Sequence, residues 1–169
     1  MNRPNEAEYD PYYGRYIALV ADDIMGSLDS QSDELRGLLS TIPEDRGTYA
    51  YDDGKWTIKE VLSHLIDGER IFAYRLLRIA RGDKTPLEGF EQDGYIENSH
   101  ANTRSFSDLL DEFAQLRRAN MAFFNNLRDD DWIRTGTANN TEISVRALAW
   151  IMAGHITHHV NILKSRYLA

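Results

Sequence analysis

Cysteine is absent from the 169 residues of this sequence. The absence excludes a disulfide framework, a thiolate metal ligand and a cysteine nucleophile, so a bound metal ion would have to be held by nitrogen and oxygen atoms. Long hydrophobic runs are missing too. No segment approaches the roughly 20 apolar residues of a membrane-spanning helix, and the polar start has no apolar signal-peptide core. We therefore expect a cytoplasmic protein without a membrane partner.

Positive charge is scarce relative to negative charge. The chain has 19 Lys and Arg residues against 27 Asp and Glu residues, a formal net charge of −8. Because binding to a phosphate backbone depends on clustered Lys and Arg, we expect no nucleic-acid partner. Hydrophobic residues make up 42% of the chain and charged residues 27%, which is the balance of a folded globular protein, and the length fits one domain.

Apolar residues recur at helical spacing in four segments, at about 24–42, 57–80, 105–127 and 144–166. The second segment has the clearest start, because Thr57 and Glu60 match a capping box and Trp56 and Val61 are placed for a hydrophobic staple. Pro43 ends the first segment, since proline cannot continue the hydrogen-bonding ladder of a helix. No segment shows a convincing alternating strand pattern.

Four amphipathic helices without strands predict an all-α fold, a four-helix bundle formed by residues 23–169. Residues 1–22 carry four tyrosines, enough aromatic surface for us to expect a strap across the bundle rather than a free tail. The connection between the second and third helices, about 81–104, is long for a compact domain. Loops of this length are often functional, so we interpret it as a partly ordered lid.

Three of the five histidines lie in the last helical segment. His155 and His159 are separated by about 40° around the helix and roughly 6 Å along it, so their imidazoles can chelate one ion. Metalloproteases use the same spacing with a glutamate after the first histidine, but Ile156 stands in that place here. Both histidines fall within the apolar stripe of the segment, whereas His158 lies at its edge. The alternative is a pair of core histidines satisfied by hydrogen bonds.

A third ligand should come from another helix, and His64 is the one other histidine within a predicted helix. Gly68, one turn later, leaves space for a close approach. Taken alone, His64 is better explained as a half-buried histidine on the flank of its helix, and His100 has no positional argument. Together with the histidine pair, however, His64 completes a predicted metal site of His64, His155 and His159.

Carboxylates near the predicted site are weaker candidates. Asp67 could orient an imidazole, although its helical position favours a solvated carboxylate. Asp93 and Tyr95 lie in the long connection and could supply a base or a substrate contact, or could only pack against the bundle. Glu69 projects among apolar residues, and we expect it to form an ion pair with an arginine.

Three stretches of the chain carry a family resemblance: GKWTIKEVLSHLIDGERIFAYRLLRIARGD at 54–83, GFEQDGY at 89–95 and GHITHHVNILKSRY at 154–167. With His64, His155 and His159 in place, the sequence resembles the DinB/YfiT-like superfamily of metal-binding four-helix bundles from about residue 12 onward. The resemblance implies that the three histidines bind nickel, zinc or another divalent ion, often in a homodimer. Members include transferases and isomerases that use low-molecular-weight thiols, hydrolases, and proteins of unknown activity. The family name implies no DNA binding.

Three neutral imidazoles leave the full charge of the ion in place and at least one coordination position open, which is typical of a catalytic metal site. Such an ion can activate a bound water or a substrate thiol near neutral pH. We therefore predict a metal-dependent hydrolase or low-molecular-weight-thiol transferase acting on a small molecule. Zinc or nickel is the expected ion, with iron, copper or manganese as alternatives. The other interpretation is a non-catalytic, metal-stabilised bundle that acts as a binding or stress-response protein.

Overall fold

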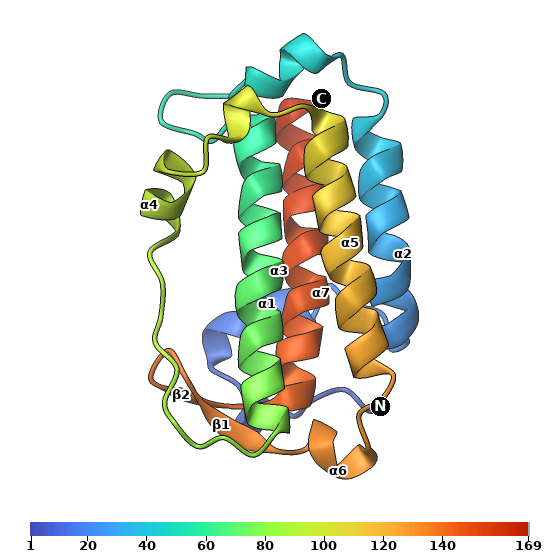
Figure 1. The fold of residues 1–169 in the computed structure, drawn as a ribbon, viewed down its shortest axis with the longest axis vertical. Helices are drawn as coiled ribbons and strands as arrows, with labels where there is room; N and C mark the ends of the chain where they lie inside the picture. The colour runs from blue at the N-terminus through green and yellow to red at the C-terminus, as the bar shows by residue number, and fades with distance from the viewer. Residues whose placement is uncertain (169) are drawn as a thin grey trace.

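The computed structural model describes residues 1–168, and four long helices dominate it (Figure 1). These are α2 (Ile24–Leu39), α3 (Ile58–Ala80), α5 (Phe106–Phe124) and α7 (Val145–Ile162). The shorter elements are α1 (Gly14–Ile17), α4 (Gln92–Glu97), α6 (Asp129–Trp132), β1 (Thr135–Ala138) and β2 (Thr141–Ser144), with 3₁₀ turns at Glu6–Glu8, Pro11–Tyr13, Glu44–Thr48 and Ala101–Thr103. The predicted four-helix bundle is confirmed.

The helix boundaries follow local capping. At the start of α3, the Thr57 hydroxyl accepts a hydrogen bond from the Glu60 N–H at 3.2 Å, and the Glu60 carboxylate accepts one from the Thr57 N–H at 2.8 Å, which confirms the capping box. Helix α5 ends three residues before the predicted position 127, where the Asn126 side chain donates to the Ala122 carbonyl at 2.7 Å. The last helix continues past Ile162 as a π-helical turn, Leu163–Tyr167.

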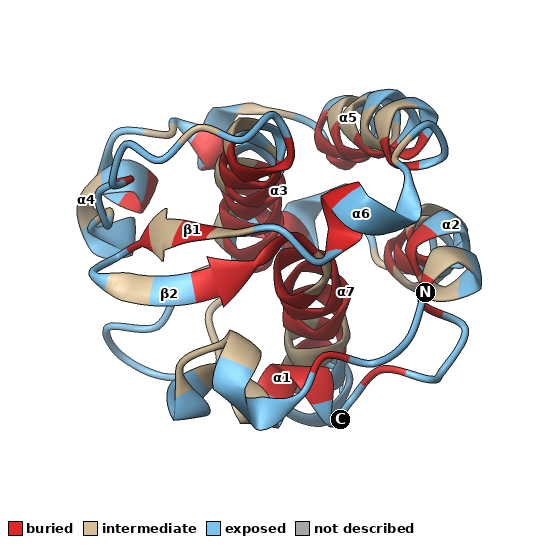
Figure 2. Ribbon diagram, turned by 90° about the horizontal axis from the view of Figure 1, so that it is seen from below, coloured by how far each residue is buried: buried red, intermediate tan, exposed pale blue. Residues whose placement is uncertain are grey.

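The order of the helices explains the long connection after α3. Helix α3 packs against α5 and α7, and α2 also packs against α5 and α7, so α2 and α3 lie at opposite corners of the bundle (Figure 2). Helices α3 and α5 both run downward in Figure 1, so the chain must return along the full length of α3 before α5 begins. At 1.5 Å per residue that length is about 35 Å. The segment 81–105 covers it and contains α4.

A β-hairpin precedes α7, which corrects the expectation of a chain without strands. Strands β1 and β2 pair antiparallel, with Thr135 opposite Ser144. Asn139 and Asn140 form the turn at φ 52° and 62°, the left-handed conformation that a two-residue hairpin turn requires and that asparagine tolerates. Leu87 bonds to this hairpin, since its N–H donates to the Thr137 carbonyl at 2.9 Å. The hairpin therefore anchors the connection after α3.

The buried residues form two apolar clusters, and Figure 2 shows that the buried faces of the long helices point toward one another. The cluster at the lower end of the bundle includes Leu28, Leu76 and Trp150, and the cluster at the upper end includes Leu35, Leu62 and Phe113. Burial of these side chains is the main favourable term in the stability of the bundle.

A polar layer, formed by Gln31, Glu69 and Arg117, lies between the two apolar clusters. Arg117 Nε and Nη2 each donate to the Glu69 carboxylate at 2.8 Å, which confirms the expected ion pair. Arg117 Nη1 donates to Gln31 Oε1 at 3.0 Å. The Gln31 amide in turn donates to the Ala153 carbonyl at 2.7 Å and to the Thr157 hydroxyl at 3.1 Å. The layer thus connects α2, α3, α5 and α7.

The N-terminal segment crosses the outside of α7. The Glu8 carboxylate accepts hydrogen bonds from the Ser144 hydroxyl at 2.7 Å and from Arg146 Nε at 2.6 Å. Further along, α1 packs directly on α7, where Gly154 leaves room for the Tyr16 backbone. No helix within residues 1–168 has the length and apolar character needed to cross a membrane.

Replacing Gly154 by alanine should weaken the packing of α1, because the added Cβ would lie 2.1 Å from the Tyr16 carbonyl oxygen. We expect a loss of about 1–3 kcal/mol in the free energy of unfolding, measured with urea. Gly37→Ala is the matched control, since Gly37 lies in α2 and a Cβ added there would have no atom within 4 Å. That change should stabilise the protein by up to about 1 kcal/mol. Equal effects at both positions would contradict the close approach.

Candidate metal centre

His64 on α3 and His155 and His159 on α7 lie together, and their ligand nitrogen atoms are all within 4.8 Å of one another. The ring centroids of each pair are 4.7–4.9 Å apart. The closest approach joins His64 Nε2 and His155 Nε2 at 2.9 Å. The structure therefore brings the three predicted ligands to one point, while their binding of a metal ion stays a prediction.

The local sequence makes this approach possible. His155 and His159 are one turn apart on α7, as their spacing requires. On α3, Gly68 follows His64 by one turn, and a Cβ built on Gly68 would lie 3.2 Å from His155 Cε1. The space that Gly68 leaves is therefore occupied by the His155 ring. The hydrogen bonds from Gln31 to Ala153 and Thr157 fix the turn of α7 that carries this ring.

Burial keeps the three imidazoles neutral. It lowers the pKa of His64 to about 4, and burial together with the neighbouring histidines lowers the pKa of His159 to about 3. Burial, reinforced by His159 and His64, also places the pKa of His155 well below its ordinary value. At neutral pH, each ring therefore offers an unprotonated nitrogen, which is the form that binds a metal ion.

The donor set fits a divalent ion of borderline softness. Within residues 1–168, the three rings form one hydrogen-bond contact, and it joins two of them: His64 Nε2 faces His155 Nε2. Two facing imidazole nitrogens can share only one proton, and no carboxylate accepts a hydrogen bond from the cluster in this part of the chain. Desolvated imidazole nitrogens that converge in this way match the preference of zinc, nickel or copper.

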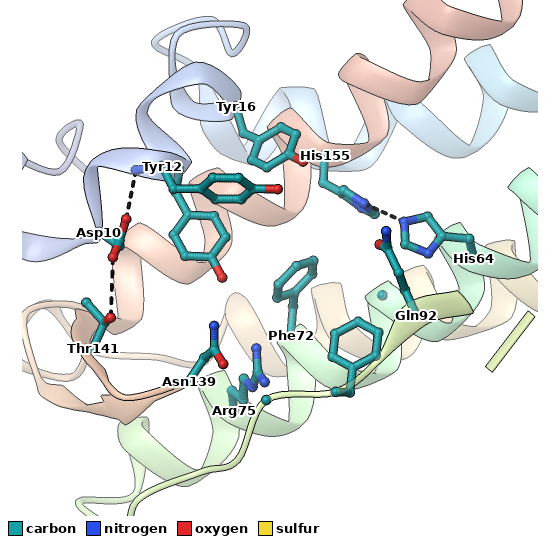
Figure 3. A pocket seen from close by; sticks show the side chains of 14 residues that line it. Asp10, Tyr12, Tyr16, His64, Phe72, Arg75, Gln92, Asn139, Thr141 and His155 are labelled. Carbon is teal, nitrogen blue, oxygen red and sulfur yellow. Dashed lines mark hydrogen bonds between the residues drawn. The ribbon is translucent and has the colours of Figure 1, made fainter. Parts of the chain in front are cut away.

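A pocket of about 360 Å³ opens beside His64 and His155 (Figure 3). It lies on the outer side of α3 and α7. The N-terminal segment, the connection after α3 and the β-hairpin form its other walls. Its side chains include Tyr12, Tyr13, Tyr16, Phe72, Phe90, Arg75, Gln92 and Asn139. In Figure 3, Phe72 lies between the two labelled histidines and Arg75. The site is thus both buried and accessible to a small molecule.

The weaker candidates lie elsewhere. Asp67 and Tyr95 line a second pocket together with Arg70, and Asp93 is exposed at the start of α4. None of the three lines the pocket beside the histidines. Gln92 does, because α4 turns this residue rather than its neighbours toward the pocket. A role for Asp67, Asp93 or Tyr95 at the site stays a prediction. Among the described residues, none of the three lines the pocket with the histidines.

Several residues of the site were not identified from the sequence. The Trp56 ring centroid lies 4.8 Å from that of His64, so Trp56 packs against one of the proposed ligands. Tyr16 lies with its ring centroid 5.7 Å from that of His155. Phe72 and Arg75 follow His64 and Gly68 at intervals of three or four residues along α3. That spacing is a signal in the sequence, since such residues share one face of a helix.

Comparisons with known proteins agree with this fold. A family model described as the DinB superfamily matches residues 27–163. No curated protein matches the sequence. Among solved structures, YfiT from Bacillus subtilis is similar, with a TM-score of 0.70 and 18% identity over 95% of this chain and 91% of that chain. YfiT is described as "a probable metal-dependent hydrolase with an unusual four-helix bundle topology". At this identity, the likeness shows a shared fold.

Proposed function

The chain belongs to the DinB superfamily, and from this premise we propose that His64, His155 and His159 bind one divalent metal ion at the active site of a small-molecule hydrolase. The observation that carries the proposal is the convergence of three neutral imidazoles, of which the two buried ones, His64 and His155, line an open pocket. The description of the similarly folded YfiT as a probable metal-dependent hydrolase supports the same reaction class. Zinc or nickel suits the three nitrogen donors.

When bound, the ion would supply a Lewis acid that polarises the substrate and makes a nucleophile available near neutral pH. The side chains of the pocket bind and orient the substrate. Burial raises the pKa of Tyr16, so its hydroxyl stays protonated and can donate a hydrogen bond. Gln92 offers an amide donor and acceptor on the opposite side (Figure 3). We assign residues 1–22 to a strap whose tyrosines exclude bulk water from this space.

Hydrolysis ranks ahead of thiol transfer because water is always available, whereas thiol transfer requires a second, thiol-bearing molecule in the same pocket. Thiol transfer by a low-molecular-weight thiol stays a prediction from the family resemblance, as does a homodimer. A metal-dependent reaction of either kind requires the same three histidines, so metal binding is the first property to test.

Elemental analysis of protein purified without an affinity tag should find about one divalent ion per chain. His155→Ala and His159→Ala should each lower metal affinity by more than the roughly 10- to 100-fold that loss of an outer-shell partner costs. His158→Ala is the matched control, because His158 lies on the same turn but outside the cluster. A parent protein that binds no more metal than His159→Ala, or a His158→Ala variant that loses the ion, would contradict the proposed site.

A further inference from the structure

Arg75 carries a positive charge that no carboxylate neutralises. Its side chain lies in the pocket wall on α3, and the residue is 5% exposed. Within residues 1–168, no Asp or Glu oxygen lies within 4.0 Å of its guanidinium, although ten other ion pairs are formed there. A buried charge is normally paired, since desolvation of an isolated ion is expensive.

Most of the hydrogen-bonding capacity of Arg75 is also unused. A guanidinium has five N–H groups, and the hydrogen bond described for Arg75 joins Nη2 to the Glu88 carbonyl at 2.6 Å. In the described part of the chain, the fully buried side-chain atoms without a partner are Ser32 Oγ and Trp150 Nε1. The remaining Arg75 nitrogens are therefore not fully buried, and in Figure 3 the guanidinium points into the pocket, where a ligand can bind it.

The other charged group of the pocket wall is already engaged. Asp10 Oδ1 accepts a hydrogen bond from the Tyr12 N–H at 2.8 Å, and its Oδ2 lies 3.5 Å from the Thr141 hydroxyl. In Figure 3, Asp10 lies at the far side of the pocket from His64, with Asn139 between it and Arg75. Asp10 therefore keeps its negative charge at a distance from Arg75, and no carboxylate among the described residues of the pocket wall contacts the guanidinium.

The geometry points to a substrate carboxylate as the missing partner, and we propose that Arg75 binds the carboxylate of an elongated monocarboxylate with an apolar or aromatic body. This inference rests on the proposed function, because it names the class of substrate for the same pocket. The guanidinium fork matches a carboxylate geometrically, and one negative charge balances one positive charge. A dianion such as a phosphate monoester would leave an excess negative charge close to Asp10.

The shape of the substrate follows from the spacing along α3. His64 and Arg75 are eleven residues apart, a rise of about 16 Å along the helix axis, and Gly68 and Phe72 lie between them on the same wall. A molecule that reaches from the histidines to Arg75 must pass Phe72 and the tyrosines of the strap. Its middle part should therefore be apolar or aromatic, so that it buries apolar surface against these rings.

The test measures 4-phenylbutanoate and its uncharged counterpart 4-phenylbutanamide by isothermal titration at pH 7.5, with full-length protein freed of metal by chelation and dialysis. The parent should bind the carboxylate at least about 10-fold more tightly than the amide. Arg75→Gln should abolish this preference, and Arg75→Lys should retain part of it. Arg118→Gln removes the same charge from an exposed site on α5 and should leave the preference intact.

Three outcomes would overturn the inference: a parent that binds the carboxylate no better than the amide, a folded Arg75→Gln variant that keeps the preference, or tighter binding of phenyl phosphate than of the carboxylate. If Arg75→Gln does not fold, the inference is tested in the parent protein through the NMR resonance of the Arg75 side-chain nitrogen. That resonance, assigned by its loss in Arg75→Lys, should shift with the carboxylate and not with the amide. The carboxylate titration uses metal-free protein, so its result does not depend on the metal site. Failure of the proposed metal site would be seen in a separate measurement, as zinc that does not bind.

Discussion

Metal-free protein should lose most of its free energy of unfolding between about pH 6 and pH 4. The folded-state pKa of His64 is about 4 and that of His159 about 3, against 6.5 for the ordinary side chain. Below pH 6.5 the unfolded chain therefore binds more protons than the folded chain, and the free energy of unfolding falls as the pH drops. Each histidine contributes a slope of about 1.4 kcal/mol per pH unit, and a domain has only about 5–15 kcal/mol in total.

Thermal unfolding of chelator-treated protein, followed by circular dichroism from pH 7.5 to pH 4, measures this loss. His155→Leu removes one of the buried bases and should reduce the slope. His100→Asn is the control, because His100 is exposed and its left-handed backbone conformation, φ 53°, suits asparagine. Zinc at 100 times its dissociation constant should add about 2.7 kcal/mol at neutral pH, and this gain should disappear in acid as protons compete for the imidazoles. A pH-independent melting temperature would contradict neutral, buried imidazoles.

Arg117→Met should destabilise the protein by about 3–5 kcal/mol, because it leaves the Glu69 carboxylate buried without its cation. The Glu69 and Arg117 side chains are 0% and 2% exposed. Asn120 would remain as a donor to Glu69 Oε1 at 2.8 Å, but it carries no charge. Urea unfolding measures the effect, which is expected to be large enough to leave a substantial unfolded population near physiological temperature.

Two further variants test the cause of this loss. Arg118→Met removes a charge from the next residue of α5, which is exposed, and should change the free energy of unfolding by no more than about 0.5 kcal/mol. The double variant Glu69→Leu with Arg117→Met removes both charges and should be more stable than Arg117→Met alone. If the double variant were less stable by the sum of two large losses, the unpaired carboxylate would not be the source of the effect.

The four long helices could be predicted because their apolar stripes and caps are local properties of the sequence. Thr57 and Glu60, for instance, determine the start of α3 through two hydrogen bonds within one turn. The hairpin was missed because its strands have four residues each, too short for alternation to be distinctive. The pair Asn139 and Asn140 was the available signal, since both residues tolerate a positive φ. The parallel arrangement of α3 and α5 depends on packing between distant segments and leaves no local signal.

The histidine cluster could be anticipated because two of its members share one helix and few other histidines exist. The rest of the pocket could not. Whether Gln92 or Asp93 faces the histidines depends on how α4 is rotated, and α4 is held by contacts with α3 that no spacing rule gives. Asp67 shows the same limit, since it is only three residues from His64 but belongs to a different pocket. The helical spacing places Arg75 on the same face of α3 as His64, but its lack of a carboxylate partner is seen only in three dimensions.

Because the chain returns along α3, the proposed metal ligands and part of the pocket wall belong to different kinds of segment. The proposed ligands belong to long helices whose positions the core determines, whereas Phe90, Gln92, Asn139 and the strap tyrosines belong to segments that merely join or precede those helices. Such segments tolerate substitution, insertion and deletion far better than packed helices do. The substrate contacts that these segments supply can therefore diverge between relatives while the metal site, Arg75 and the bundle stay unchanged. Exchanging the 81–105 segment is a direct way to change that part of the substrate preference.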